Sequence, residues 1–152
     1  MKKSNKHQKI IQNNKEKHRM NEVLNILKEN QVQFFATVGR DGKAKVRPFS
    51  FCFEMDDKLW FGTNSTKEVY KDLEQNPYIE LAVVTSDMTT LRLSGKVVFE
   101  DSKKVKEEMM NIPVIKMQYQ NAENPILKSF YLQDIHATIS DMTSNTPREY
   151  QI

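Results

Sequence analysis

Residues 43–67 read KAKVRPFSFCFEMDDKLWFGTNSTK, two apolar runs joined by a polar turn. Within the first run, residues 44–54, successive side chains point to opposite sides of a predicted strand. One side receives Lys45, Arg47, Phe49, Phe51 and Phe53. Three phenylalanines on one side need burial, so this run and the second one, residues 59–61, predict a β-hairpin at the core.

The end of the predicted hairpin is polar. It reads GTNSTK from Gly62 to Lys67, and a helical pattern begins at Glu68. The first turn of a helix leaves N–H groups unpaired and carries the positive end of the helix dipole, so it favours an anion such as a phosphate. Lys67 would add a full positive charge there. A second interpretation stays open, in which Ser65 or Thr66 caps the helix and Lys67 is solvated.

The rest of the chain predicts short helices and strands around this hairpin. Helical spacing or capping residues indicate helices over 20–30, over 68–75 before Asn76-Pro77, and from 101 or 102 to Pro113. Strands are predicted over 33–38, 78–84, 91–100 and 136–141, with a bulge at Gly95, whereas 114–119 and 126–132 stay ambiguous. Six strands without a regular strand–helix–strand alternation predict a mainly β protein with flanking helices, built as a small barrel.

Length and composition exclude several classes of protein. At 152 residues, with 38% hydrophobic and 28% charged residues, we expect one globular domain. No apolar run is long enough to span a membrane or to form a signal core, so we expect a cytoplasmic protein. Cys52 is the only cysteine, which excludes an intrachain disulfide and a cysteine zinc cluster and predicts an inert buried thiol. The histidines, His7, His18 and His136, have no metal-ligand spacing, and we expect no protein-bound metal.

Positive charge is concentrated at the N-terminus. Residues 1–20 hold seven lysines and arginines and one glutamate, a net charge of +6, so the remaining chain carries −3 of the total of +3. A nucleic-acid-binding domain needs a basic surface on its folded part, and the acidic remainder argues against that role. We expect residues 1–19 to be a solvated basic arm or an extension of the first helix, and residues 20–152 to be the folded domain.

From about Glu22 to the C-terminus, the order of these segments resembles the pyridoxamine 5′-phosphate oxidase-like family of FMN-binding split barrels. The matching pieces are Arg47-Pro48-Phe49, Thr63-Asn64 followed by Lys67, Asn76-Pro77 and Leu93-Ser94-Gly95-Lys96-Val97. The resemblance implies a six-stranded, Greek-key-like split barrel that forms a homodimer, with FMN in clefts at the interface.

The resemblance also implies a cofactor site. Its residues would be Arg47, Pro48, Phe49 and Ser50 along the flavin ring, Gly62, Thr63, Asn64, Thr66 and Lys67 near the phosphate, and Arg92 as a further candidate. The segment between Asn64 and Lys67 is shorter than in the full-length oxidases and lacks their Arg-Lys pair. The C-terminus lacks the substrate motif of the vitamin B6 oxidases, so we do not predict oxidation of pyridoxamine phosphate.

The resemblance favours an FMN-dependent oxidoreductase that acts on a small molecule by hydride transfer through flavin N5. The alternative is a module that binds flavin or haem without turnover, in which His136 would be the haem ligand because it is the only histidine of the folded part. The sequence holds no arrangement of Ser-His-Asp, Cys-His or paired carboxylates that would indicate a hydrolase.

Overall fold

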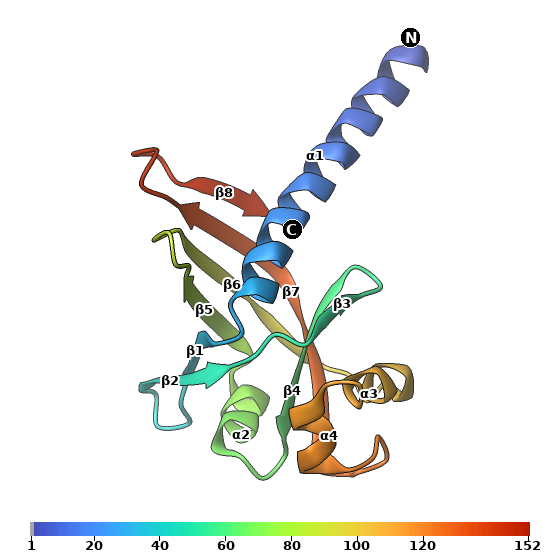
Figure 1. Ribbon diagram of the computed structural model, residues 1–152, viewed down its shortest axis with the longest axis vertical. Helices are drawn as coiled ribbons and strands as arrows, with labels where there is room; N and C mark the ends of the chain where they lie inside the picture. Colours follow the sequence, from blue (N-terminus) through green and yellow to red (C-terminus); the bar gives the residue numbers. More distant parts are fainter. Residues whose placement is uncertain (1) are drawn as a thin grey trace.

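The computed structural model describes residues 2–152, which form four helices and eight strands (Figure 1). In chain order the elements are α1 (Lys2–Glu29), β1 (Gln33–Val38), β2 (Ala44–Phe49), β3 (Phe53–Met55), β4 (Lys58–Asn64), α2 (Glu68–Gln75), β5 (Tyr78–Val84), β6 (Thr90–Phe99), α3 (Lys103–Met109), α4 (Pro113–Tyr119), β7 (Leu127–Ser140) and β8 (Arg148–Gln151).

The strands of the described chain form one antiparallel sheet in the order β2-β1-β5-β6-β7-β4-β3, and β8 pairs with β7. Consecutive strands β2 and β3 therefore lie at opposite ends of this order. The sheet curls without a hydrogen-bonded ladder that joins its two ends. This arrangement is a split barrel, which confirms the predicted fold class.

The predicted strand over 44–54 is wrong in one respect, because it breaks at residues 50–52. β2 pairs with β1, whereas β3 pairs only with β4 in a short hairpin. Asp56 and Asp57 both have positive φ, as a tight two-residue hairpin turn requires. At the break, Phe51 N–H donates to the side chain of Gln33 instead of to a neighbouring strand. Residues 50–52 thus leave β2 at one end of the sheet order and lead to β3 at the other.

Elsewhere the structure extends the sequence predictions. The helix over 68–75 and the strand over 78–84 are confirmed, and the β6–β7 register shifts beside Gly95, where a Cβ would lie 3.1 Å from Gln133 O. The segments 126–132 and 136–141 belong to one strand of 14 residues, β7. The sequence analysis missed β8, and the described chain has eight strands instead of six.

A cluster of phenylalanines fills the core between the two ends of the sheet, which no hydrogen-bonded ladder joins. Phe35 of β1 stacks on Phe49 of β2 at 4.5 Å between ring centroids, and Phe61 of β4 stacks on Phe130 of β7 at 5.5 Å. Phe35 lies 6.0 Å from Phe61, and Phe51 lies 5.7 Å from Phe61, so aromatic contacts join the two ends of the sheet. Burial of each ring contributes roughly 2 to 3 kcal/mol.

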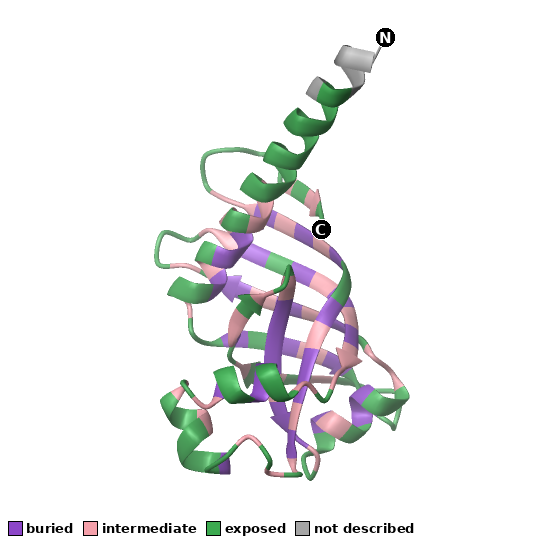
Figure 2. Cartoon of the chain, turned by 90° about the vertical axis from the view of Figure 1, so that its right-hand side faces the viewer, coloured by how far each residue is buried: buried purple, intermediate pink, exposed green. Residues whose placement is uncertain are grey.

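The basic arm is continuous with the first helix. α1 runs over 28 residues, its residues 8–18 are exposed, and it projects away from the body (Figures 1 and 2). Met1 lies outside the described residues. Only the last turns pack on the sheet, through Val23, Leu24 and Leu27. Arg148 and Tyr150 of β8 hold these turns, since each bonds Glu22 at 2.6 Å.

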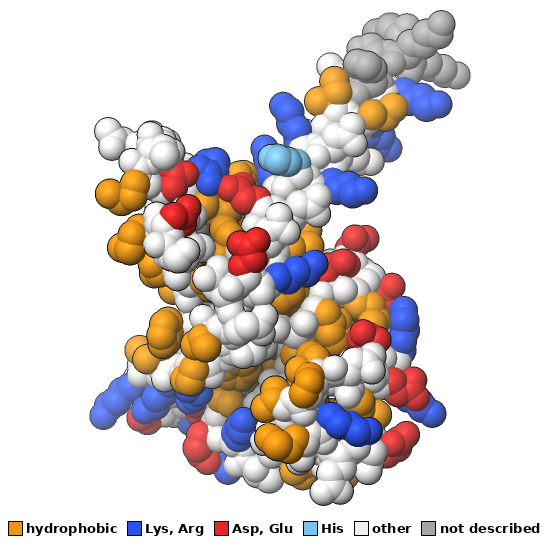
Figure 3. All heavy atoms as spheres, in the orientation of Figure 1, with side chains coloured by type: hydrophobic (Ala, Val, Ile, Leu, Met, Phe, Trp, Pro, Cys, Tyr) orange, Lys and Arg blue, Asp and Glu red, His pale blue; other side chains and the backbone are white. Residues whose placement is uncertain are grey.

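The outer face of the sheet is apolar and exposed at the β2-β1-β5 end. Phe34 is 59% exposed and pairs with Pro48 on one side and Ala82 on the other, while Val46 and Val84 are 67% and 56% exposed. Figure 3 shows hydrophobic side chains at the surface on the left side of the body. We call Phe34, Val46, Pro48 and Val84 the outer apolar face.

Candidate functional site

A pocket of about 380 Å³ lies between the end of α1, the β2–β3 connection, the start of α2 and α4. The residues that line it are Lys28, Gln31, Val32, Pro48, Phe49, Ser50, Phe51, Cys52, Lys67, Ile112, Val114, Ile115 and Gln118. The pocket therefore brings together four of the predicted site residues, Pro48, Phe49, Ser50 and Lys67.

The aromatic wall of the pocket is the β2–β3 connection, which Gln33 holds in place. Gln33 is fully buried; its Oε1 accepts from Phe51 N at 2.6 Å, and its Nε2 donates to Asn30 O at 2.6 Å. Ser50 Oγ donates to Gln31 O at 2.7 Å. These hydrogen bonds tie the connection to the end of α1, so two walls of the pocket form one unit.

Hydrogen bonds within the β4–α2 loop order the opposite end of the pocket. Asn64 Oδ1 accepts from both the backbone N and the Oγ1 of Thr66 at 2.7 Å. Lys67 is the N-cap residue of α2, with an extended backbone and no side-chain capping hydrogen bond. The interpretation in which Ser65 or Thr66 caps α2 is therefore wrong, because Asn64 accepts the hydrogen bonds of Thr66 and Lys67 is the N-cap residue.

The three predicted site residues of β4, Gly62, Thr63 and Asn64, lie outside the pocket lining. The Cα of Gly62 faces α3 and α4, where an added Cβ would lie 3.6 Å from Met109 Sδ and 3.9 Å from Ile115. Thr63 points to the other side, is 3% exposed, and its Oγ1 has no hydrogen-bond partner among the described residues.

Arg47 also lies outside the pocket lining, because Asp72 of α2 holds its side chain. Arg47 donates to Asp72 Oδ2 at 2.9 Å and to Thr37 Oγ1 at 2.6 Å, and Arg40 donates to Asp72 Oδ1 at 3.1 Å. Burial alone would raise the pKa of Asp72, but the hydrogen bonds from Arg40 and Arg47 outweigh it and hold this pKa below its ordinary value. Arg47 thus fastens α2 to the sheet.

Arg92 and His136 lie on strands away from the pocket. Arg92 of β6 is paired with Glu80 of β5, and its side chain is 63% exposed. His136 of β7 is 43% exposed, and its Nε2 lies 3.7 Å from Glu149 of β8. Neither residue lines the pocket.

The sequence analysis missed the contributions of α1 and α4. Lys28 comes from the end of a helix that the sequence did predict, and Gln31 from the connection after it, but no spacing signal linked them to residues 48–52. Ile112 belongs to the helix predicted before Pro113, and Ile115 belongs to the segment 114–119 that the sequence left ambiguous. Cys52 also lines the pocket, and burial raises the pKa of its thiol to about 12, so it is uncharged and unreactive at neutral pH.

The pocket is positively charged. Lys28 and Lys67 line it, and its lining holds no aspartate or glutamate. In the described chain, neither lysine takes part in an ion pair. The sequence after residue 20 has a net negative charge, whereas this pocket is positive. The pocket therefore favours an anionic ligand.

Among the side chains that the structure describes, which do not include that of His7, no group of three or more His, Cys, Asp or Glu could hold a metal ion. In residues 2–152, no helix has the length and apolar character needed to cross a membrane. The cytoplasmic location stays a prediction.

Both the family model and solved structures define the class of this split barrel. The model described as pyridoxamine 5′-phosphate oxidase matches residues 20–138, and the chain belongs to this family. A crystal structure of a NimC/NimA family protein from Clostridium acetobutylicum is 27% identical, with a TM-score of 0.79 over 88% of this chain and 92% of the other. No curated protein gives a significant match.

Two further solved structures share the fold at lower identity. One is a pyridoxamine 5′-phosphate oxidase-related, FMN-binding protein from Nostoc punctiforme, 14% identical, with a TM-score of 0.62 over 78% of this chain and 79% of the other. The second is a haem-binding protein from Mycobacterium smegmatis, 12% identical, with a TM-score of 0.66 over 83% of this chain and 55% of the other.

Proposed function

We propose that this protein binds FMN in the pocket between α1, α2 and α4 and is an oxidoreductase that acts on a small molecule. The observation that carries the proposal is one pocket with an aromatic wall and an unpaired lysine at a helix start. FMN, when bound, supplies hydride transfer through its N5 atom. The protein binds and orients the reactants.

The phosphate of FMN fits the end of the pocket at Lys67. Lys67 is exposed there, and the backbone N–H groups at the start of α2 bring the positive end of the helix dipole. Asn64 and Thr66 do not line the pocket, but their hydrogen bonds hold the loop that presents Lys67. Gly62, Thr63, Arg47 and Arg92 do not line this pocket, and their contact with FMN stays a prediction.

The flavin ring fits the apolar part of the pocket. Phe49 and Phe51 form one wall, and Ile112 and Ile115, at and just after the N-cap of α4, form the other. A flat ring gains free energy from contact with such walls because it leaves water there. Cys52 remains a neutral thiol at neutral pH and adds no charge beside the ring.

We also infer a homodimer in which the outer apolar face is buried. The face combines exposed Phe34, Val46 and Val84, and a contiguous apolar patch of this kind is typical of a protein interface. Pro48 belongs both to this face and to the pocket lining. The pocket would thus open at the edge of the interface, where a second copy can cover it.

An absorption spectrum and an FMN titration test the proposal. We expect flavin absorption in the purified protein, or quenching of flavin fluorescence when FMN is added to the flavin-free protein. Lys67→Gln should weaken FMN binding about tenfold, since it removes a charge-assisted hydrogen bond to the phosphate. Lys103→Gln, on exposed α3 outside the pocket, is the control. A protein that takes up no FMN contradicts the proposal.

The fold likeness to a haem-binding protein makes haem the second candidate ligand. A haem complex would show a Soret band in the same spectrum. His136, the predicted haem ligand, lies outside the pocket lining beside Glu149, so the pocket itself favours flavin. A Soret band that disappears in His136→Ala would overturn this preference.

A further inference from the structure

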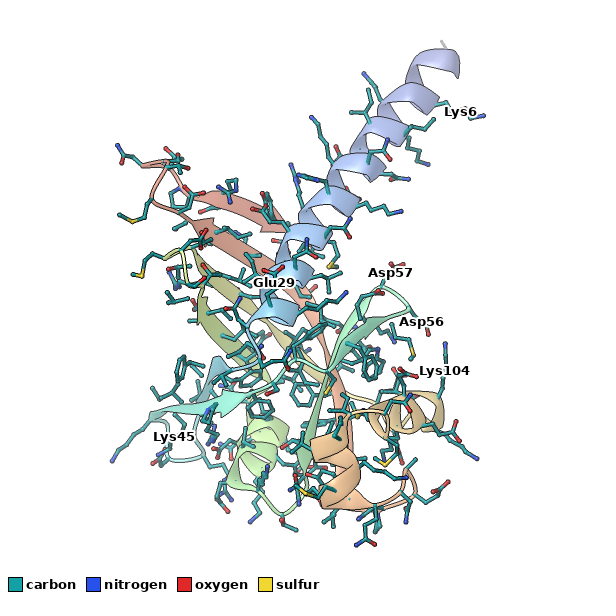
Figure 4. The ribbon with its side chains drawn as sticks, in the orientation of Figure 1. Lys6, Glu29, Lys45, Asp56, Asp57 and Lys104 are labelled. Atoms are coloured by element: carbon teal, nitrogen blue, oxygen red, sulfur yellow. The ribbon has the colours of Figure 1, made fainter. Side chains whose placement is uncertain are left out.

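A second lysine, Lys28, lines the pocket and has no role in the proposed binding of the FMN phosphate. Lys67 comes from the start of α2, whereas Lys28 comes from the last turn of α1. In Figure 1, α1 ends above the β2–β3 connection and α2 begins below it. Figure 4 marks the same end of α1 by its label on Glu29, the next residue in the chain. The two lysines therefore belong to different ends of the pocket.

The protein itself does not neutralise Lys28. Other cations around the core do have carboxylate partners: Arg47 lies 2.9 Å from Asp72, Arg148 lies 2.6 Å from Glu22, and Lys106 lies 2.5 Å from Asp101. Lys28 has no such partner in the described chain, and the pocket lining offers it no carboxylate. A cation that lines a pocket without a partner attracts an anionic ligand group.

Neighbouring groups fix the position from which Lys28 acts. Gln31 Nε2 donates to Lys28 O at 2.8 Å, and the connection that follows is held by the Ser50–Gln31 hydrogen bond. The amides of Gln31 and Gln118 also line the pocket. A lysine in the last turn of a helix also interacts favourably with the helix dipole, so any test must separate that structural effect from ligand binding.

We propose that Lys28 makes the site selective for substrates that carry a carboxylate. This inference rests on the proposed function, since it assigns Lys67 to the cofactor and Lys28 to the substrate. The walls at Phe49, Phe51 and Ile115 are assigned to the flavin ring, and Lys28 would meet the carboxylate of the substrate at the α1 end of the pocket. Lys28 is in this sense a specificity-determining residue and takes no part in electron transfer.

The test compares two probes of equal shape, 4-nitrobenzoate and 4-nitrobenzamide, by calorimetric titration of the full chain. With FMN bound, the wild-type protein should bind the carboxylate about tenfold more tightly than the amide, the value of one charge-assisted hydrogen bond. Lys28→Gln should remove that difference and leave the amide unchanged. Lys28→Arg should preserve it. Added salt should weaken binding of the carboxylate alone.

Lys116→Gln is the matched control, because Lys116 is an exposed lysine of α4 outside the pocket lining. The proposal is overturned if neither probe binds, if both bind equally, if Lys28→Gln weakens both equally, or if Lys116→Gln acts like Lys28→Gln. Thermal unfolding of each variant measures the helix-dipole effect separately. If the protein takes up no FMN, the flavoprotein proposal fails, and the same two probes still decide the role of Lys28 in the flavin-free pocket.

Discussion

Gln33 Oε1 accepts a hydrogen bond from the backbone N–H of Phe51 at 2.6 Å, across the point where the chain leaves β2. Gln33→Met should destabilise the protein by about 1 to 3 kcal/mol, because Phe51 N and Asn30 O lose their buried partner. Urea unfolding measures this loss. Gln12→Met is the control, since Gln12 bonds only the exposed Glu16, and it should change stability by less than about 0.5 kcal/mol. Equal effects of the two variants would contradict the role given to Gln33.

The Asp72 carboxylate predicts a dependence of stability on pH. Its pKa is lowered in the folded protein, so the ionised form contributes stability above the ordinary carboxyl pKa of about 4, and this stability is lost as pH falls through the folded value. Asp72→Asn should unfold at lower denaturant concentration at neutral pH and lose part of the acid dependence. Glu80→Gln, in the exposed pair with Arg92, is the control. A wild-type pH profile in Asp72→Asn would contradict this assignment.

Glu22 is the point at which β8 holds α1. Tyr150→Phe and Arg148→Gln should each loosen this end of the helix, since Tyr150 and Arg148 bond the two oxygens of Glu22 at 2.6 Å. A single hydrogen bond of this kind is worth about 0.5 to 1.5 kcal/mol. Hydrogen exchange should become faster over residues 20–29 and stay unchanged in β5. Unchanged exchange in α1 would show that apolar packing alone holds the helix.

The projecting part of α1 contributes little to stability. Deletion of residues 1–17 should shift the melting temperature by no more than about 2 °C, because residues 8–17 are exposed and the Glu22 contacts remain. Lys6 is labelled near the end of this segment in Figure 4. Calorimetry of the two chains measures the shift. A larger loss would mean that the arm packs on a second copy of the protein.

Cys52 gives a chemical probe of the pocket. With a pKa of about 12, its thiol should react with a disulfide reagent at pH 8 more than about a hundredfold more slowly than a free thiol, since only the thiolate attacks. The rate should rise with pH, and saturating FMN should lower it further, because Cys52 lines the proposed site. Rapid labelling that FMN does not affect would place the ligand elsewhere.

Local patterns were sufficient to predict much of the fold. The helix before Asn76-Pro77 and the bulge at Gly95 follow from the restricted backbone before proline and from the lack of a side chain in glycine. The break at residues 50–52 was not predictable, because it depends on Gln33, 18 residues away from Phe51. Short β8 lacks a periodic signal of its own and forms by pairing with β7.

The candidate site was predictable in part for the same reason. Pro48, Phe49, Ser50 and Lys67 belong to one continuous stretch, and the fold brings them to one pocket. Arg47 was assigned to the cofactor from the family resemblance of Arg47-Pro48-Phe49, whereas its partner Asp72 comes from a different element. Lys28 carries no local signal, because only the tertiary path of α1 places it at the pocket.

The short connection between β2 and β3 forms a wall of the pocket. It also links the two edge strands of the curled sheet covalently. A ligand in contact with Phe49 and Phe51 would stabilise this connection between the two edge strands. A ligand bound in the pocket should then slow unfolding of the barrel as well as stabilise the native state at equilibrium. The protein would resist unfolding most when the proposed cofactor is abundant.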